Sequence, residues 1–302
     1  MHVAVEFPLA SHRWGTGAVL ELARAIEDVG YDEIDMFDHV TVGLPIPGRS
    51  EARHAVPELL EPLVTLGAIS AVTERIGLGT GVLVLPQRQP ALVAKQVATL
   101  DVLSGGRVRL GVGVGWQRSE YESLGVPFEE RGRRIDEAIT LMRRYWTEPS
   151  VSFHGQFYRA EAMGMDPKPV QPGGPPLWIG GDSEAALRRV GRLGDGWMAM
   201  ADSDEAVLSA PEKLATIRAA AETAGRDPAA IGLQARLSDP LDLESLTRRV
   251  TGLRAAGFTW VTVSLPALEI EGVVGVAAQV DALSRIRERL RHDTSDQLDT
   301  HS

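Results

Sequence analysis

Short runs of apolar, largely β-branched residues alternate along the chain with longer stretches in which apolar residues recur every three or four positions. The first pattern is typical of buried strands and the second of amphipathic helices. Eight strands are predicted in this way. They cover Val3–Phe7, Asp32–Phe37, Arg75–Leu85, Arg107–Val112, Leu177–Gly180, Gly196–Met200, Ile231–Arg236 and Thr259–Leu265.

A predicted helix follows each predicted strand. These helices cover Gly17–Val29, Pro57–Val72, Pro90–Leu103, Glu129–Trp146, Ser183–Arg192, Asp204–Ala224, Leu243–Ala256 and Gly272–Arg291. Eight β-then-α units predict an α/β protein with a (β/α)8 TIM-barrel fold. The alternative is a doubly wound open sheet, which favours a glycine-rich turn directly after the first strand. Here the residues PLASHRWG follow that strand instead, so the barrel is the favoured interpretation.

The alternation predicts one barrel domain over residues 1–291, with a single interruption. An irregular, proline-rich insertion covers about residues 147–176, between the fourth helix and the fifth strand. Within it, the segment VSFHGQFYRAE alternates in the manner of a small β-hairpin. The polar residues 292–302 are expected to form a disordered tail.

Composition narrows the possible partners. The formal net charge is −10, which argues against a nucleic-acid partner. The absence of cysteine excludes disulfides, thiolate metal sites and a cysteine nucleophile, and the seven histidines show no metal-binding spacing. The chain shows neither a signal peptide nor an apolar run long enough for a membrane helix, so we expect a cytoplasmic protein that does not bind membranes.

In a barrel enzyme the loops that follow the strands form the active face. Asp38 and His39 follow the second predicted strand. A histidine there titrates near neutral pH and can donate or accept a proton. The alternative is a structural histidine that is hydrogen-bonded to a loop carbonyl.

Glycines alternate along two neighbouring strands. The third carries Gly77, Gly79 and Gly81, and the fourth carries Gly111, Gly113 and Gly115. A strand face without side chains lets a flat ring approach the backbone, although close packing against a neighbouring element would also require glycine. The G-x-G-x-G spacing lacks a helix directly after it and an acidic strand end about twenty residues on, which argues against a nicotinamide fingerprint.

The fifth strand ends in Gly180 and Gly181, followed by Asp182, Ser183 and a predicted helix. Exposed backbone N–H groups at the positive end of a helix favour anion binding, so this turn is a candidate phosphate site. The alternative is an ordinary tight turn between a strand and a helix.

Together these strand ends resemble one family. The segments FDH, LGTGVL, GRVRLGVGVGWQRSEYESLGVPFEERGRRIDEAI and PLWIGGDSEAALRRVGRLGDGW are similar to the luciferase-like monooxygenase superfamily of flavin and deazaflavin oxidoreductases. The resemblance covers about residues 3–200 and is greatest to the bacterial branch that uses the deazaflavin coenzyme F420. It implies a barrel with a tricyclic cofactor in its mouth, whose phosphate-bearing tail is held by the loops after the fourth and fifth strands.

The resemblance also implies roles for particular residues. His39 would be the catalytic residue near the reactive carbon, with Asp38 beside the ring. Gly81-Val82 would be a non-proline cis peptide that supports the ring from behind. The residues expected around the tail are Val114, Gly115, Ser119, Gly181, Asp182 and Ser183.

Some positions depart from the family pattern. Trp116 stands where the sugar-phosphate dehydrogenases have an acidic residue and Gly43 where they have a tryptophan, which argues against glucose 6-phosphate as the substrate. Val114 falls about where the luciferases carry an arginine for the flavin phosphate, which favours F420 over FMN. Trp14, Trp116 and the loop Val42–Arg53 are expected to wall an apolar substrate pocket.

The predicted function is therefore hydride transfer between F420 and a small organic substrate. One alternative is an FMN-dependent monooxygenase that receives reduced flavin from a partner reductase. Another is a cofactor-binding barrel without turnover. A homodimer is expected as the common default for soluble enzymes.

Overall fold

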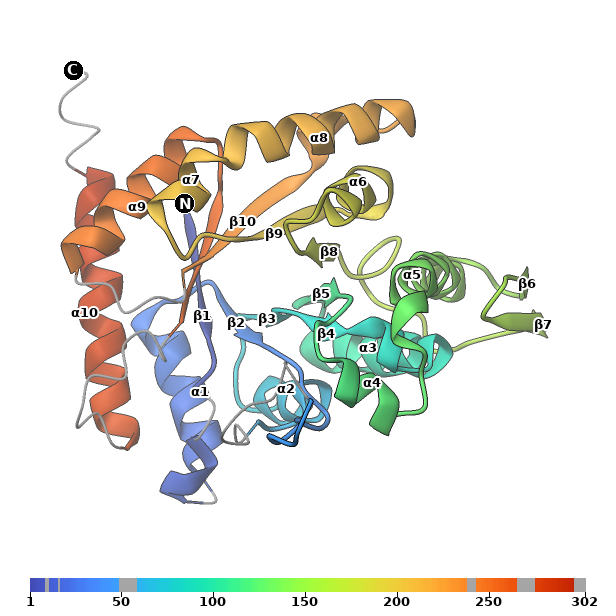
Figure 1. Cartoon of the computed structure of the whole chain (residues 1–302). Helices are drawn as coiled ribbons and strands as arrows, with labels where there is room; N and C mark the ends of the chain where they lie inside the picture. The colour runs from blue at the N-terminus through green and yellow to red at the C-terminus, as the bar shows by residue number, and fades with distance from the viewer. Residues whose placement is uncertain (9–10, 16, 49–58, 238–242, 265–274, 296–302) are drawn as a thin grey trace.

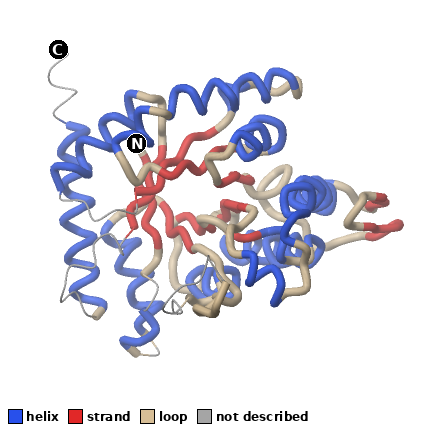
Figure 2. The backbone as a smooth tube through the Cα atoms, in the orientation of Figure 1, coloured by secondary structure: helices blue, strands red, loops and turns tan. Residues whose placement is uncertain are grey.

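The computed structural model describes residues 1–8, 11–15, 17–48, 59–237, 243–264 and 275–295 of the chain. Within these residues the strands form one closed parallel barrel, because β3 pairs with β5 and β1 pairs with β11 (Figure 2). This confirms the (β/α)8 prediction. The barrel strands are β1 (His2–Glu6), β2 (Glu33–Met36), β3 (Gly77–Thr80), β5 (Val108–Gly113), β8 (Leu177–Gly180), β9 (Gly196–Met200), β10 (Gly232–Leu237) and β11 (Trp260–Ser264).

The helices surround the strands, as Figure 1 shows. They are α1 (Ala18–Val29), α2 (Pro62–Ser70), α3 (Pro90–Ser104), α4 (Arg118–Ser123), α5 (Arg131–Thr147), α6 (Glu184–Leu193), α7 (Asp204–Leu208), α8 (Ala210–Thr223), α9 (Leu243–Ala255) and α10 (Val276–Ser295). Short 3-10 turns cover Ser11–Trp14, Leu85–Gln87, Phe128–Glu130 and Pro228–Ala230. The main core lies between helices and strands, where residues such as Leu22, Ile26 and Ile34 are fully buried.

The third predicted strand is divided in two. β3 ends at Thr80, and β4 (Leu83–Val84) continues alongside β5 after the Gly81-Val82 peptide. That peptide bond is cis, as the family resemblance implied. The turn in the backbone brings this segment to the end of the barrel where the strands finish.

Several predicted helices have different bounds. α2 begins at Pro62, so the predicted helix is wrong for residues 59–61; the Glu61 carboxylate accepts a hydrogen bond from the Val64 N–H at 2.7 Å and caps the helix there. The single helix expected over Asp204–Ala224 is interrupted at Ser209, because Pro211 lies in the first turn of α8 and has no N–H to continue a preceding helix.

At the C-terminus, α10 continues to Ser295, four residues beyond the expected end at Arg291. The predicted tail at 292–302 is therefore wrong for its first four residues. The rest of that tail, residues 296–302, lies outside the described residues, as do 57–58 and 272–274 of two predicted helices.

The hydrophobic pattern did not predict α4, the short helix that follows the glycines of the fourth strand. The insertion does contain the predicted hairpin, formed by the antiparallel strands β6 (Val151–His154) and β7 (Arg159–Met163). It projects beside α5 on the side away from α10 (Figure 1). The Glu137 carboxylate of α5 accepts the N–H groups of Gln156 and Phe157 at 2.7 and 2.9 Å, which ties the hairpin turn to the barrel.

Large side chains close the end of the barrel where the strands begin. The Arg109 guanidinium lies between the rings of Trp178 and Trp260, at 4.2 and 4.3 Å from their centroids, and its Nε donates a hydrogen bond to the buried Glu33 carboxyl group at 2.9 Å. Gly196 and Gly232 leave room for the Trp178 ring, which any Cβ at either position would overlap. Ligands are therefore confined to the opposite end.

Candidate functional site

A cavity of about 280 Å³ lies at the end of the barrel where the strands finish. One side of it, which we call the glycine wall, consists of Gly81, Val82, Gly113, Val114, Gly115, Gly180 and Gly181. The other side, which we call the polar wall, consists of Glu6, Asp35, Gln234, Arg236 and Thr262. Trp116 and the β9 residues Met198, Ala199 and Met200 complete the lining. The volume lies just below the range of about 300–1,000 Å³ for small-molecule sites.

Much of the glycine pattern serves packing within the barrel. Cβ atoms at Gly113 and Gly180 would lie 2.6 and 2.8 Å from methyl groups of Val82, so these glycines accommodate the side chain of the cis peptide. A Cβ at Gly111 would overlap the Thr80 carbonyl, and one at Gly79 would overlap the Asp35 and Glu33 carboxylates. The prediction that both glycine series expose bare backbone to a ligand is therefore wrong at Gly79 and Gly111.

The polar wall is a hydrogen-bonded layer inside the barrel. Glu6 is 2% exposed, forms an ion pair with Arg236 and accepts a hydrogen bond from Ser264 Oγ at 3.0 Å. Asp35 Oδ2 accepts from Gln234 Nε2 at 2.8 Å and from Thr262 Oγ1 at 2.7 Å. These residues carry two carboxylates and one guanidinium, so the wall does not favour an anion.

His39 adjoins this cavity without appearing in its lining. Its Nδ1 lies 3.0 Å from Glu120 Oε2, and the two side chains are 9% and 1% exposed. Glu120 also accepts the Val40 and Thr41 N–H groups, at 2.7 and 3.2 Å. Burial alone would raise the pKa of Glu120, but the hydrogen bonds and charge of His39, together with the backbone bond, hold it below its usual value.

An ionised Glu120 thus fixes the orientation of His39 and the start of the following loop. The edge of the His39 ring meets Trp116, with 5.9 Å between ring centroids. Trp116 lines the cavity and is therefore the residue that connects the buried pair to it.

The Asp38 side chain turns away from this pair. Its carboxylate binds the Arg88 guanidinium at 2.7 and 3.1 Å and accepts the Val84 N–H at 3.0 Å. These contacts hold β4, the short strand that follows the cis peptide. Asp38 does not line the cavity, and its predicted contact with a cofactor ring stays a prediction.

The turn after β8 has the geometry of a tight connection. Gly181 has a φ of +115°, its carbonyl accepts the Trp197 indole N–H at 3.1 Å, and Ser183 caps α6 by accepting the Ala186 N–H. Asp182 Oδ2 lies 2.9 Å from Lys213 Nζ. Lys213 is thus a cation beside the predicted phosphate site, and no pattern in the sequence places it there.

The structure brings Gly81, Val82, Val114, Gly115 and Gly181 to one cavity, together with Trp116, and their predicted contacts with a cofactor stay predictions. The predicted residues Ser119, Asp182 and Ser183 lie outside its lining. Trp14 packs against the hydrophobic core and does not wall the cavity, and the predicted loop Val42–Arg53 runs into residues outside the described part of the chain.

The sequence reasoning considered strand ends and so missed the polar wall. A signal was present: Glu6, Asp35, Gln234 and Arg236 interrupt strands whose other residues are mostly apolar. Buried polar residues require hydrogen-bonding partners, and three strands that carry such residues indicate a shared polar layer. Glu120 belongs to the sequence segment after the fourth strand that resembles the family, but that segment did not indicate its contact with His39.

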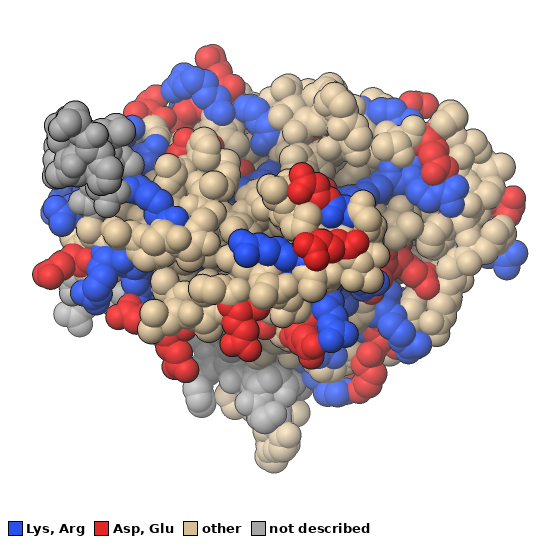
Figure 3. Space-filling model, turned by 90° about the horizontal axis from the view of Figure 1, so that it is seen from above, with Lys and Arg blue, Asp and Glu red and all other residues tan. Residues whose placement is uncertain are grey.

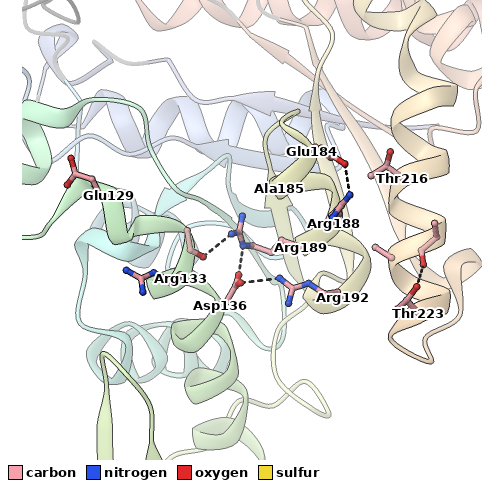
Figure 4. A pocket seen from close by; sticks show the side chains of 13 residues that line it. Glu129, Arg133, Asp136, Glu184, Ala185, Arg188, Arg189, Arg192, Thr216 and Thr223 are labelled. Carbon is pink, nitrogen blue, oxygen red and sulfur yellow. Dashed lines mark hydrogen bonds and ion pairs between the residues drawn. The ribbon is translucent and has the colours of Figure 1, made fainter.

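A larger hollow of about 830 Å³ lies on the outside of the barrel, over α6 between α5 and α8 (Figure 4). Arginines line it, and carboxylates compensate three of them: Asp136 pairs with Arg189 and Arg192, and Glu184 pairs with Arg188. It receives no residue from a barrel strand. We therefore assign the candidate active site to the smaller cavity at the barrel mouth.

Other features of the described residues bear on partners. No group of histidine, aspartate or glutamate side chains within them is arranged to hold a metal ion. None of the helices in the described part of the chain combines the length and apolar character needed to cross a bilayer. On the face shown in Figure 3, basic and acidic side chains are interleaved.

Comparison with known proteins identifies the family. The sequence model of the luciferase-like monooxygenase family matches residues 8–238. The chain therefore belongs to this family.

Several curated proteins are similar in sequence. An uncharacterized protein of Mycobacterium tuberculosis is 40% identical over 190 residues, which are 59% of this chain and 64% of that protein. The F420-dependent hydroxymycolic acid dehydrogenase of the same species is 32% identical over 76% of this chain and 60% of its own. The F420-dependent glucose-6-phosphate dehydrogenase of Nakamurella multipartita is 32% identical over 73% and 62%. The chain thus spans less than two thirds of the length of these relatives.

Solved structures share the fold. An F420-dependent secondary alcohol dehydrogenase superposes with a TM-score of 0.77 and 18% identity, covering 96% of this chain and 98% of that one. A monooxygenase from Streptomyces bottropensis superposes with a TM-score of 0.75 and 20% identity, covering 97% and 100%.

Proposed function

We propose that this protein is an F420-dependent oxidoreductase that transfers a hydride between the deazaflavin and a small organic substrate. The observation that carries the proposal is the cavity at the barrel mouth, which contains the cis Gly81-Val82 peptide in one wall and adjoins the buried His39–Glu120 pair. Two relatives at 32% identity are named as F420-dependent dehydrogenases.

The residues present fit such a cofactor. Gly81, Gly115 and Gly181 place backbone along one side of the cavity, where a flat ring can approach. Lys213 balances the charge of Asp182 at the turn proposed for the anionic tail. When bound, the deazaflavin supplies the hydride chemistry, and the protein supplies binding, orientation and electrostatics.

His39 is the proposed acid or base. Because Nδ1 is held by Glu120, Nε2 is the ring nitrogen left to exchange a proton with a substrate. Burial keeps water from Glu120 and so maintains the orientation of the ring. Hydride transfer to or from a carbon–oxygen group leaves a proton to move at the oxygen, and His39 would move it.

The lining argues against a phosphorylated substrate. Trp116 and the three β9 residues are uncharged, and Arg236 is compensated by Glu6. A phosphate would have to be desolvated next to Glu6 and Asp35 without a spare cation in the described lining. We therefore propose an uncharged organic substrate.

Titration of the purified protein with F420 and with FMN, followed by absorbance, tests the cofactor. We expect F420 to bind at least ten times more tightly than FMN. An Asp182→Asn, Lys213→Met variant, in which both members of an ion pair become neutral, should change the affinity for F420 more than the affinity for its ring fragment lacking the phosphate. Tighter binding of FMN would contradict the assignment of F420.

The second candidate is an FMN-dependent monooxygenase, which the family description and the Streptomyces fold relative favour. Oxygen consumption separates the two, because a deazaflavin reacts poorly with oxygen. Oxygen uptake with reduced FMN and substrate would support this candidate. Binding of F420 without turnover over a broad panel of alcohols and ketones would instead support a cofactor-binding protein.

A further inference from the structure

Gln234 belongs to the polar wall and is 1% exposed. Its Nε2 donates to Asp35 Oδ2 at 2.8 Å and contacts Thr262 Oγ1, while the Thr262 hydroxyl donates to the same Asp35 oxygen at 2.7 Å. Reversing the amide would turn its oxygen toward a carboxylate oxygen. The hydrogen bonds therefore fix Nε2 toward Asp35 and leave Oε1 as the remaining polar atom of the side chain.

Gln234 Oε1 is buried and has no hydrogen-bond partner among the described residues. Asp35 Oδ1 is also without a standard donor, but it has a neighbour that can supply one. Asp35 Oδ1 and Glu33 Oε1 both lie next to the position that a Cβ atom of Gly79 would occupy. Burial raises the pKa of Glu33 well above its usual value, although the Arg109 guanidinium opposes this shift, so Glu33 can share a proton with Asp35 while it accepts the hydrogen bond from Arg109. No such neighbour accounts for Gln234.

A buried acceptor without a donor costs about 1–3 kcal/mol. Gln234 lines the cavity proposed to hold cofactor and substrate, so a bound molecule can supply that donor. We propose that Gln234 recognises the bound molecule: its Oε1 accepts a hydrogen bond from an N–H or O–H group that faces the polar wall. This inference rests on the proposed function, because it takes the occupant to be a deazaflavin or flavin and its substrate.

The wall also restricts the chemical class of that group. Glu6 and Asp35 face the cavity with only Arg236 to balance them, and Arg236 already pairs with Glu6. A carboxylate or phosphate placed there would meet like charge, whereas an alcohol or the N–H edge of a pyrimidine ring would not. A site with a buried acceptor also rejects an analogue that lacks the donor, since the acceptor is then left unpaired.

The protein side of the test compares Gln234→Met with Ser264→Ala. Ser264 lies on β11 and donates to Glu6, but it does not line the cavity, so its variant also loses one buried hydrogen bond. Dissociation constants for F420 and FMN are measured by fluorescence titration. If the donor belongs to the cofactor ring, Gln234→Met should weaken binding about 10- to 100-fold. Ser264→Ala should change it less than threefold.

The ligand side keeps the wild-type protein and so does not depend on the variant folding. The cofactor that binds is compared with its N3-methylated form, and the loaded protein is titrated with 2-butanol and with 2-methoxybutane, again by fluorescence. If N3-methylation weakens cofactor binding to wild type but not to Gln234→Met, the ring N–H is identified as the donor. If wild type binds the alcohol but not the ether, and Gln234→Met loses alcohol binding while its cofactor affinity is unchanged, a substrate hydroxyl is identified as the donor.

Either result supports the inference. The inference is overturned if wild type binds the cofactor, the methylated ligands bind as tightly as the unmethylated ones, and Gln234→Met has the same affinities as wild type. Gln234 is then a structural residue. Wild type that binds neither F420 nor FMN gives a different outcome, which overturns the proposed function and this inference with it.

Discussion

Each end of the barrel carries a histidine beside a carboxylate, and the two pairs differ in every respect that matters for chemistry. At the closed end, His2 lies 3.3 Å from Asp32 with side chains 56% and 30% exposed, and its ring stacks on Trp260. At the open end, the His39–Glu120 pair is almost completely buried and adjoins a cavity. Burial and position, not the residue types, distinguish a candidate catalytic pair from a surface contact.

Glycines show the same contrast. Those of the closed end, such as Gly196, make room for a tryptophan that seals the barrel. Those of the open end make room partly for Val82 and partly for a hollow. Changes at the closed end should therefore alter the free energy of unfolding, and changes at the open end should alter turnover.

The largest expected effect is on turnover at the open end. His39→Ala should lower turnover about 10²- to 10⁴-fold, the usual contribution of a general acid or base, while leaving cofactor affinity within about threefold. His2→Ala at the closed end is the matched control and should leave turnover unchanged. Steady-state kinetics and a binding titration measure both; equal activity in the two variants would remove His39 from the mechanism.

At the closed end, Gly196→Ala should lower the free energy of unfolding by about 3 kcal/mol, because the new methyl group overlaps the Trp178 ring. Gly67→Ala, within α2 and with no atom near the added Cβ, should be neutral or stabilising by up to about 1 kcal/mol. Urea unfolding measures both. If Gly196→Ala were as stable as wild type, the Trp178 ring would have to shift more easily than its packing indicates.

A smaller effect is expected at the carboxylate that orients His39. Glu120→Gln keeps the size of the side chain but weakens its hold on His39, so turnover should fall about 10-fold and its pH profile should shift, with KM changing less. Asp32→Asn, its counterpart at the closed end, should leave the profile in place. A drop in turnover with an unshifted profile would reduce Glu120 to a structural role.

The smallest effect concerns acid stability. The folded-state pKa of Glu120 is below its usual value, so its contacts stabilise the fold above the unfolded-state pKa of about 4.3 and are lost as the pH falls through the folded-state value. The difference in the free energy of unfolding between wild type and Glu120→Gln should therefore become smaller as the pH falls from 5 to 3. Urea unfolding at several pH values measures this difference, and a difference that stays constant would contradict an ionised Glu120.

The sequence determined the barrel, because eight alternations of buried strand and amphipathic helix have few other ways to bury their apolar faces. It also indicated the cavity residues Gly81, Gly115 and Gly181, since strand ends of a parallel barrel meet at one face, whereas Val114 was implied only by the family resemblance. Both predictions follow from local pattern together with a known topology.

Only the tertiary structure decided which side chains face one another across the barrel. Gln234 and Asp35 are far apart along the chain, and their contact depends on the stagger of strands around the ring. Likewise, nothing in the local sequence shows that Glu120 holds His39 or that Val82 fills the space above Gly113 and Gly180. Hydrophobic periodicity records which face of an element is buried, but not which residue of another element it meets there.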